Sequence, residues 1–243
     1  DADRAAFLSK SDLATGMVTE FTELQGEMGK EYALLDGEKP EVAQAIFEQY
    51  MPRFAGDILP EQEIGRALSL ADKLDNLAAT FLRGLIPTGS QDPFALRRQT
   101  IGAVNILTDG KIHWDIRRGI EAALALLPGD EETKKTVLSQ IEDFFRQRIK
   151  AIMLDEGIAY DIIDAVLAGP VDDIYALFLK ARSMAESQLK DEAELRQAVT
   201  RLANITKGKT GGKVDPSLFT EDVEKKLQDA FEAVAAKALP LFA

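Results

Sequence analysis

Apolar residues recur at helical spacing along most of the chain. After Pro40 and again after Pro60 they stand at every third or fourth position, as the buried face of a helix requires. Proline suits the first turn of a helix, because its missing N–H has no intrahelical partner there in any case. No stretch shows the sustained alternation of apolar and polar residues, rich in β-branched types, that is typical of a strand. The pattern predicts an all-α fold of about ten helices.

Glycine, proline and capping residues mark where these helices begin and end. Two stretches rich in glycine, proline and small polar residues, 84–92 and 206–216, form the clearest seams. Asp92 and Pro93 are expected to open the helix that follows the first seam. The expected helical ranges are 4–20, 22–35, 40–51, 60–81, 92–107, 115–127, 130–154, 159–168, 171–189, 191–205 and 220–238.

The composition narrows the classes of function. The 243 residues carry 29 lysines and arginines against 41 aspartates and glutamates, a formal net charge of −12. Such a surface repels a nucleic-acid backbone, so any contact of that kind needs a local basic patch. Hydrophobic residues make up 46%, too many for a disordered chain, and no apolar run approaches the roughly 18 residues of a membrane span. The absence of cysteine excludes disulfides and thiolate metal sites.

Few residues carry obvious catalytic chemistry. His113 is the single histidine, which rules out sites built on several imidazoles, and its place before a helix favours a turn or capping role over that of a general base. Asp72 and Asp75 are three residues apart and so share a helix face. They could hold a divalent ion or do acid–base chemistry, but hard cations need more than two oxygen ligands. A solvated helix edge is the favoured interpretation.

The segment from Arg201 to Lys213 is locally basic. Its Gly208-Lys209-Thr210 string suggests a phosphate loop, but Ala203 stands where the first glycine of that motif is needed, and no strand leads into it. A nucleotide-binding loop is therefore rejected. Four cations and no acid remain in the segment, so a local phosphate contact and a solvated loop both stay open. The cations are Arg201, Lys207, Lys209 and Lys213.

Several strings of residues, in this order, resemble those of one protein family. Among them are LSKSDL at 8–13, YMPR at 50–53, LADKLD at 70–75 and PTGSQDPFALRR at 87–98. Together they resemble the β subunit of the bacterial two-subunit glycyl-tRNA synthetase, with strong likeness over residues 6–107 and looser likeness beyond. The last of these strings is the most specific to the family.

The resemblance implies a domain organisation and the loss of a metal site. Residues 1–108 resemble an HD-type phosphohydrolase domain without its amino-terminal part, and 109–243 a helical linker followed, from about 171, by the start of an anticodon-binding helical domain. The chain is expected to be a fragment, with its last domain cut short or separately disordered. Ser11 and Asp12 stand where a His-Asp pair is expected, and Asp72 resembles the distal aspartate. Because His113 is the single imidazole, no metal set can be assembled, so no metal and no catalytic residue are expected.

The resemblance also implies a role in glycylation of tRNA. The chain is expected to be a non-catalytic, tRNA-binding portion of glycine–tRNA ligase, working in the cytoplasm within an α/β heterotetramer. ATP and Mg²⁺ would be used by the α subunit, so no cofactor is expected in this chain. The expected partners are that subunit and tRNA-Gly, with no DNA and no membrane.

Candidate tRNA contacts and two rival functions follow from the same resemblance. The residues expected near tRNA are Arg97, Arg98, Arg201, Asn204, Lys207, Lys209 and Lys213. For Arg97 and Arg98, ion pairs with nearby acids are the structural alternative. One rival function is a metal-dependent HD-type phosphohydrolase with Asp12, Asp72 and Asp75 as ligands. The other is a pure assembly scaffold that binds the α subunit and no RNA.

Overall fold

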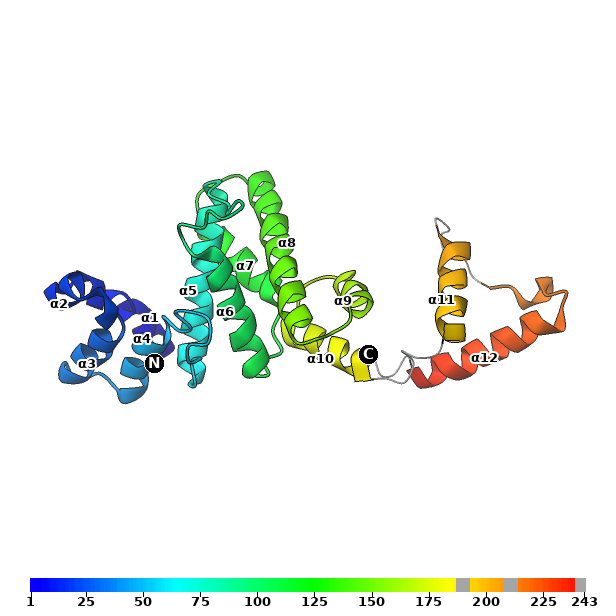
Figure 1. Ribbon diagram of the computed structural model, residues 1–243, viewed down its shortest axis with the longest axis horizontal. Helices are drawn as coiled ribbons and strands as arrows, with labels where there is room; N and C mark the ends of the chain where they lie inside the picture. Colours follow the sequence, from blue (N-terminus) through cyan, green and yellow to red (C-terminus); the bar gives the residue numbers. More distant parts are fainter. Residues whose placement is uncertain (187–192, 208–213, 239–243) are drawn as a thin grey trace. The chain divides into compact units, whose positions relative to one another are not determined.

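Helices supply almost all the regular structure of the protein. The computed structural model describes residues 1–186, 193–207 and 214–238 (Figure 1). Within those ranges the extended pairings are two isolated bridges, Thr88 with Gln91 and Asp115 with Asp173. The all-α prediction is confirmed. In the same ranges no helix is both long and apolar enough to cross a membrane.

The chain divides into two compact units, residues 1–190 and 191–243. The described helices of the first are α1 (Ala2–Leu8), α2 (Gly16–Glu20), α3 (Glu27–Leu35), α4 (Pro40–Glu48), α5 (Glu63–Leu82), α6 (Leu96–Asp109), α7 (Ile116–Ala125), α8 (Glu131–Asp155), α9 (Tyr160–Leu167) and α10 (Ile174–Glu186). Those of the second are α11 (Ala193–Thr206) and α12 (Asp222–Ala238). Short 3₁₀ turns occupy Ser11–Ala14, Thr22–Leu24 and Pro216–Leu218. The expected domain limits at 108 and about 171 stay predictions.

The first expected helix, 4–20, is wrong as a continuous element. Structure there breaks into α1, the 3₁₀ turn Ser11–Ala14 and α2. The break centres on Asp12, whose carboxylate is buried and accepts a hydrogen bond from the backbone N–H of Gly26. Thr15 then caps α2 by accepting from the N–H of Val18 while its hydroxyl donates to the carbonyl of Asp12. Side-chain bonds of this kind compete with a regular helix.

The start of α6 also differs from expectation. The N-cap residue is Ala95 rather than Asp92, although the carboxylate of Asp92 still accepts hydrogen bonds from the N–H groups of Leu96 and Arg97 at 2.8 and 3.0 Å. The helix nevertheless begins at Leu96 rather than directly after Asp92, since Ala95 adopts a left-handed conformation with φ of 53°.

One large hydrophobic core joins α5 to α10. The helix α5 packs against α6, α7 and α8, and the rings of Phe81 and Phe144 meet edge-on at 5.2 Å between centroids. A smaller cluster is formed by α1, α3 and α4, against which Ile64 and Leu68 of α5 also pack. The long helix α5 therefore contributes to both clusters.

The crossing of α5 and α7 depends on a helical glycine. A Cβ atom at Gly119 would lie 2.3 Å from the ring of Trp114 and 2.9 Å from Leu74. We expect Gly119→Ala to lower the free energy of unfolding by about 1–3 kcal/mol, because the ring and the leucine would have to move. Urea denaturation followed by circular dichroism measures the change.

Gly16→Ala is the matched control, since no atom lies within 4 Å of the added carbon. It should leave the protein equally stable or up to about 1 kcal/mol more stable. Equal unfolding midpoints for the two variants would contradict the close approach of α7 to Trp114.

Candidate functional site

The residues that resemble an HD-type site lie around one tyrosine. Asp12 is 1% exposed, and its Oδ1 accepts a hydrogen bond from the hydroxyl of Tyr50 at 3.0 Å. Asp72 lies on α5, where its Oδ1 is 2.8 Å from the ammonium of Lys10. That ammonium in turn lies 4.7 Å from the centroid of the Tyr50 ring. Burial, together with the nearby charges of Asp12 and Asp72, raises the pKa of Tyr50, so its hydroxyl stays protonated and donates.

Both oxygens of Asp12 are used by the protein itself. While Oδ1 accepts from Tyr50, Oδ2 accepts from the N–H of Gly26 at 2.6 Å. Gly26 is required there, because its φ is +84° and a Cβ atom would lie 2.8 Å from the Tyr50 ring. The buried carboxylate therefore joins three segments: the turn after α1, the start of α3 and the residues after α4.

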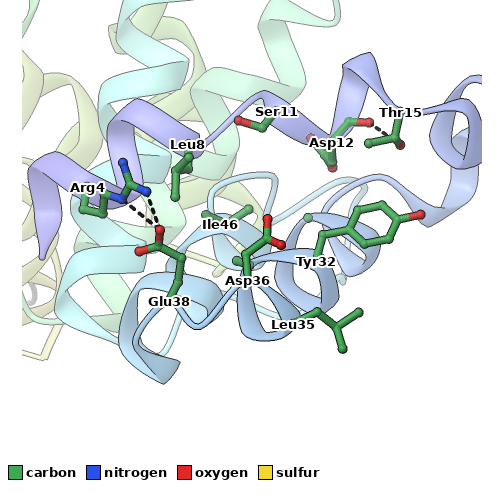
Figure 2. A pocket seen from close by; sticks show the side chains of 12 residues that line it. Arg4, Leu8, Ser11, Asp12, Thr15, Tyr32, Leu35, Asp36, Glu38 and Ile46 are labelled. Carbon is green, nitrogen blue, oxygen red and sulfur yellow. Dashed lines mark hydrogen bonds and ion pairs between the residues drawn. The ribbon is translucent and has the colours of Figure 1, made fainter.

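The arrangement does not fit a divalent metal ion. A depression of about 590 Å³ lies beside Ser11 and Asp12. Within it, Arg4 points at Glu38 and forms an ion pair with it (Figure 2). Ser11 is exposed and supplies no imidazole. In the described part of the chain, no three acidic or imidazole groups are placed to hold a metal. The prediction that no metal is bound stays a prediction, which these contacts support.

Sequence reasoning missed Lys73. The favoured interpretation of Asp72 and Asp75 was a solvent-exposed helix edge, and Asp75 is indeed exposed. Lys73, between them, is only 3% exposed. Its ammonium donates to the carbonyl of Met51 at 2.8 Å and to the hydroxyl of Ser69 at 2.6 Å. Burial lowers the pKa of Lys73 to about 8. The signal was present in the sequence, because Lys73 falls among leucines of the apolar stripe of α5.

Arg97 and Arg98 do not form the ion pairs that were their structural alternative. Arg97 donates to the carbonyl of Gly89 at 2.8 Å, and Arg98 to the carbonyl of Arg53 at 3.2 Å. Neither guanidinium pairs with a carboxylate in the part of the chain that the structure describes. Within the described residues, neither guanidinium at the start of α6 is therefore offset by an ion-pair partner.

The remaining predicted contacts belong to the second unit. Arg201 and Asn204 are exposed and lie three residues apart on α11, and exposed Lys207 follows the last residue of that helix. Lys209 and Lys213 lie outside the described residues. The structure thus supports a common side for Arg201 and Asn204 but does not test contact with RNA.

His113 has a structural contact in keeping with its expected turn role. Its Nδ1 lies 2.8 Å from Oδ2 of Asp173, and its ring meets that of Tyr175 edge-on with 4.9 Å between centroids. These contacts join the turn before α7 to the start of α10.

The hydroxyl of Tyr50 provides a test of the buried carboxylate. We expect Tyr50→Phe to lower the free energy of unfolding by about 1–3 kcal/mol, because Asp12 would lose a donor while staying buried. Tyr32→Phe is the control, since the structure gives the Tyr32 hydroxyl no hydrogen-bond partner within the described residues, and it should change stability by less than about 0.5 kcal/mol. Chemical denaturation measures both; equal effects would disprove the bond.

Lys73 should make stability depend on pH. Its pKa is about 8 in the folded protein and 10.5 in a free lysine, so between these values the unfolded chain binds more protons. The free energy of unfolding therefore rises with pH in that window as the penalty for burying the charge is relieved. As pH rises from 8 to 10.5, we expect the free energy of unfolding of Lys73→Met to fall relative to that of the wild type, by up to about 3 kcal/mol.

Urea denaturation in phosphate-free buffer at several pH values measures this difference. Exposed Lys180→Met is the control and should keep a constant difference from the wild type. A flat difference for Lys73→Met as well would show that the buried ammonium has an ordinary pKa.

Comparison with known proteins identifies one family. The sequence model of the family described as "Glycyl-tRNA synthetase beta subunit" matches residues 1–168. The chain is 48% identical over 238 residues to the glycine–tRNA ligase beta subunit of Clostridioides difficile, a match that covers 98% of this chain and 35% of that protein. It is 44% identical over 242 residues to the protein of the same name from Desulforamulus reducens, covering 98% and 35%.

The chain spans about a third of the length of these curated relatives. The resemblance to this family, first drawn from strings such as 70–75 and 87–98, is confirmed by the match. Because that match extends over more than half of the chain, the chain belongs to the glycyl-tRNA synthetase beta subunit family.

Proposed function

We propose that this chain is a non-catalytic, tRNA-binding portion of the beta subunit of a glycine–tRNA ligase. The family match over residues 1–168 carries the proposal, and relatives that bear this name support it. The complete α/β heterotetramer would join glycine to tRNA-Gly in the cytoplasm. ATP and Mg²⁺ would be used by the α subunit, without a cofactor in this chain and without DNA or a membrane as partner.

The charge distribution supports RNA contact at α11. In a chain of net charge −12, exposed Arg201 and Asn204 lie on the last turns of α11, and the exposed cation Lys207 follows directly after the helix. Cationic side chains supply the main affinity for phosphates, and an amide can add hydrogen bonds to phosphate, sugar or base. Arg97 and Arg98 stay among the proposed contacts, as do Lys209 and Lys213.

Such a chain would act on glycylation without touching the reacting atoms. Binding energy gained where tRNA is held can be used to orient its distant acceptor end in the α subunit. The contacts of Asp12 and Asp72 argue against the rival phosphohydrolase, because Tyr50 and Lys10 occupy the places next to these carboxylates.

Neutralising α11 tests the proposal. We expect Arg201→Gln with Lys207→Gln, in the complete α/β enzyme, to weaken tRNA binding and to flatten its dependence on salt. The log–log slope should fall by about 0.9 for each duplex phosphate that the variant no longer neutralises, and by about 0.7 where the RNA is single-stranded. Filter binding over a range of salt concentrations measures the slope, and tRNA charging and glycine-dependent pyrophosphate exchange are followed in parallel.

Lys180→Gln with Lys226→Gln is the control for an equal loss of charge at exposed positions. Loss of charging with exchange intact in the α11 variant alone would agree with the proposal, whereas an unchanged slope would show that this segment does not touch tRNA. Binding of the α subunit without any RNA affinity would favour the scaffold. Divalent metal in the purified chain with release of phosphate from nucleotides would favour the phosphohydrolase.

A further inference from the structure

A small cavity with basic walls lies next to Asp72. Its volume is about 240 Å³, and it is bounded by the turn after α1, the residues that follow α4, and the helices α5 and α6. The charged side chains that line it are Lys10, Arg53, Asp72, Lys73 and Arg98. Four cations therefore face one carboxylate, within a chain whose net charge is strongly negative.

Two of the four cations are neutralised by the protein. Lys10 pairs with Asp72 at 2.8 Å, and Arg53 pairs with Asp57 at 3.0 Å. Lys73 and Arg98 form no ion pair within the described residues, and the acceptors that the structure gives them are neutral. The four cations of the lining thus exceed Asp72 and Asp57, the two carboxylates paired with them, by about two positive charges, an excess that favours an anion in the cavity.

The two uncompensated cations are held in place from different sides. The ammonium of Lys73 is fixed by the carbonyl of Met51 and the hydroxyl of Ser69. Its stem is confined by α6, because a Cβ atom at Gly102 would lie 3.0 Å from Cε of Lys73. Arg98 projects from α6 and uses one terminal nitrogen on the carbonyl of Arg53, which leaves most of its donors available.

We propose that this cavity binds a phosphate group, with Arg98 and Lys73 as the residues that neutralise it. Arg98 would donate directly, since a guanidinium presents several N–H groups in a geometry that suits phosphate oxygens. The amide of Gln99 also lines the cavity; one of its N–H groups donates to the carbonyl of Phe94, and the other can donate to a tetrahedral anion. A cation would be repelled here, because the one carboxylate of the lining is already paired. The inference needs only the cavity and does not depend on RNA contact at α11.

Arg98 and Arg97 form a matched pair for the test. They are adjacent arginines at the start of α6, and Arg98 lines the cavity while Arg97 does not. We expect the full chain to bind inorganic phosphate more tightly than acetate at equal ionic strength, as measured by calorimetry. Arg98→Gln should weaken phosphate binding at least about tenfold, the size expected for loss of a charge-assisted bond. Arg97→Gln should change it by less than about twofold.

The cavity assignment fails if phosphate and acetate bind alike, or if the two variants lose phosphate equally. Exposed Arg98 makes one bond to a backbone carbonyl, so its variant is expected to fold, and circular dichroism checks this. Lys10→Gln is the second variant. It leaves the charge of Asp72 without its partner, so Asp72 should repel phosphate and weaken its binding. Unchanged phosphate binding in Lys10→Gln would also count against the cavity.

The source of the phosphate is decided by competition with a short single-stranded RNA. If the RNA displaces inorganic phosphate from the wild type and Arg98→Gln binds the RNA less tightly, the cavity takes a backbone phosphate. If inorganic phosphate stays bound, the cavity takes a free phosphate. Either result supports the site, while the α11 variants report on tRNA binding separately, so the two proposals can fail independently.

Discussion

The buried carboxylate of Asp12 determines how the first fifty residues are arranged. It joins the turn after α1 to Gly26 at the start of α3 and to Tyr50 beyond α4, through two hydrogen bonds of 2.6 and 3.0 Å. A buried charge is costly without such partners, so each bond restrains the segment that supplies it. Because Tyr50 is held in this way, its ring supports Lys10, which pairs with Asp72 on α5. The positions of Lys10 and Asp72, which line the cavity, thus depend on the carboxylate of Asp12, which does not line it.

The same contacts explain why a resemblance to a phosphohydrolase domain does not bring its chemistry. Metal ligands must be free to give their oxygens to the ion, and here each oxygen of Asp12 accepts a hydrogen bond while Asp72 pairs with an ammonium. What remains at this place is an excess of positive charge, with Lys73 and Arg98 beside it. The proposed binding of an anion there agrees with a subunit whose proposed role is to hold RNA.

Long amphipathic helices could be predicted from the sequence, and contacts between distant segments could not. The expected ranges 40–51, 60–81 and 130–154 correspond to α4, α5 and α8, because periodic burial decides these elements locally. The expected helix 4–20 is interrupted around Asp12, whose carboxylate accepts a hydrogen bond from the backbone N–H of Gly26, fourteen positions away. The cavity was missed for the same reason, since its cations come from four separate segments. The burial of Lys73 could have been predicted, because this lysine lies on the apolar stripe of α5, but its neighbours Asp72 and Asp75 indicated a solvated edge.

The position of α5 limits how this unit can be divided. Near its start Ile64 and Leu68 complete the cluster of α1, α3 and α4, while from Leu70 onward its apolar residues belong to the larger core. Without α5, the first sixty residues therefore lack two residues that complete their hydrophobic cluster. The helices after α5 need the same helix for the larger core. Neither half is therefore an independent module, and the amino-terminal helices and the main bundle have to be kept together as one folding unit.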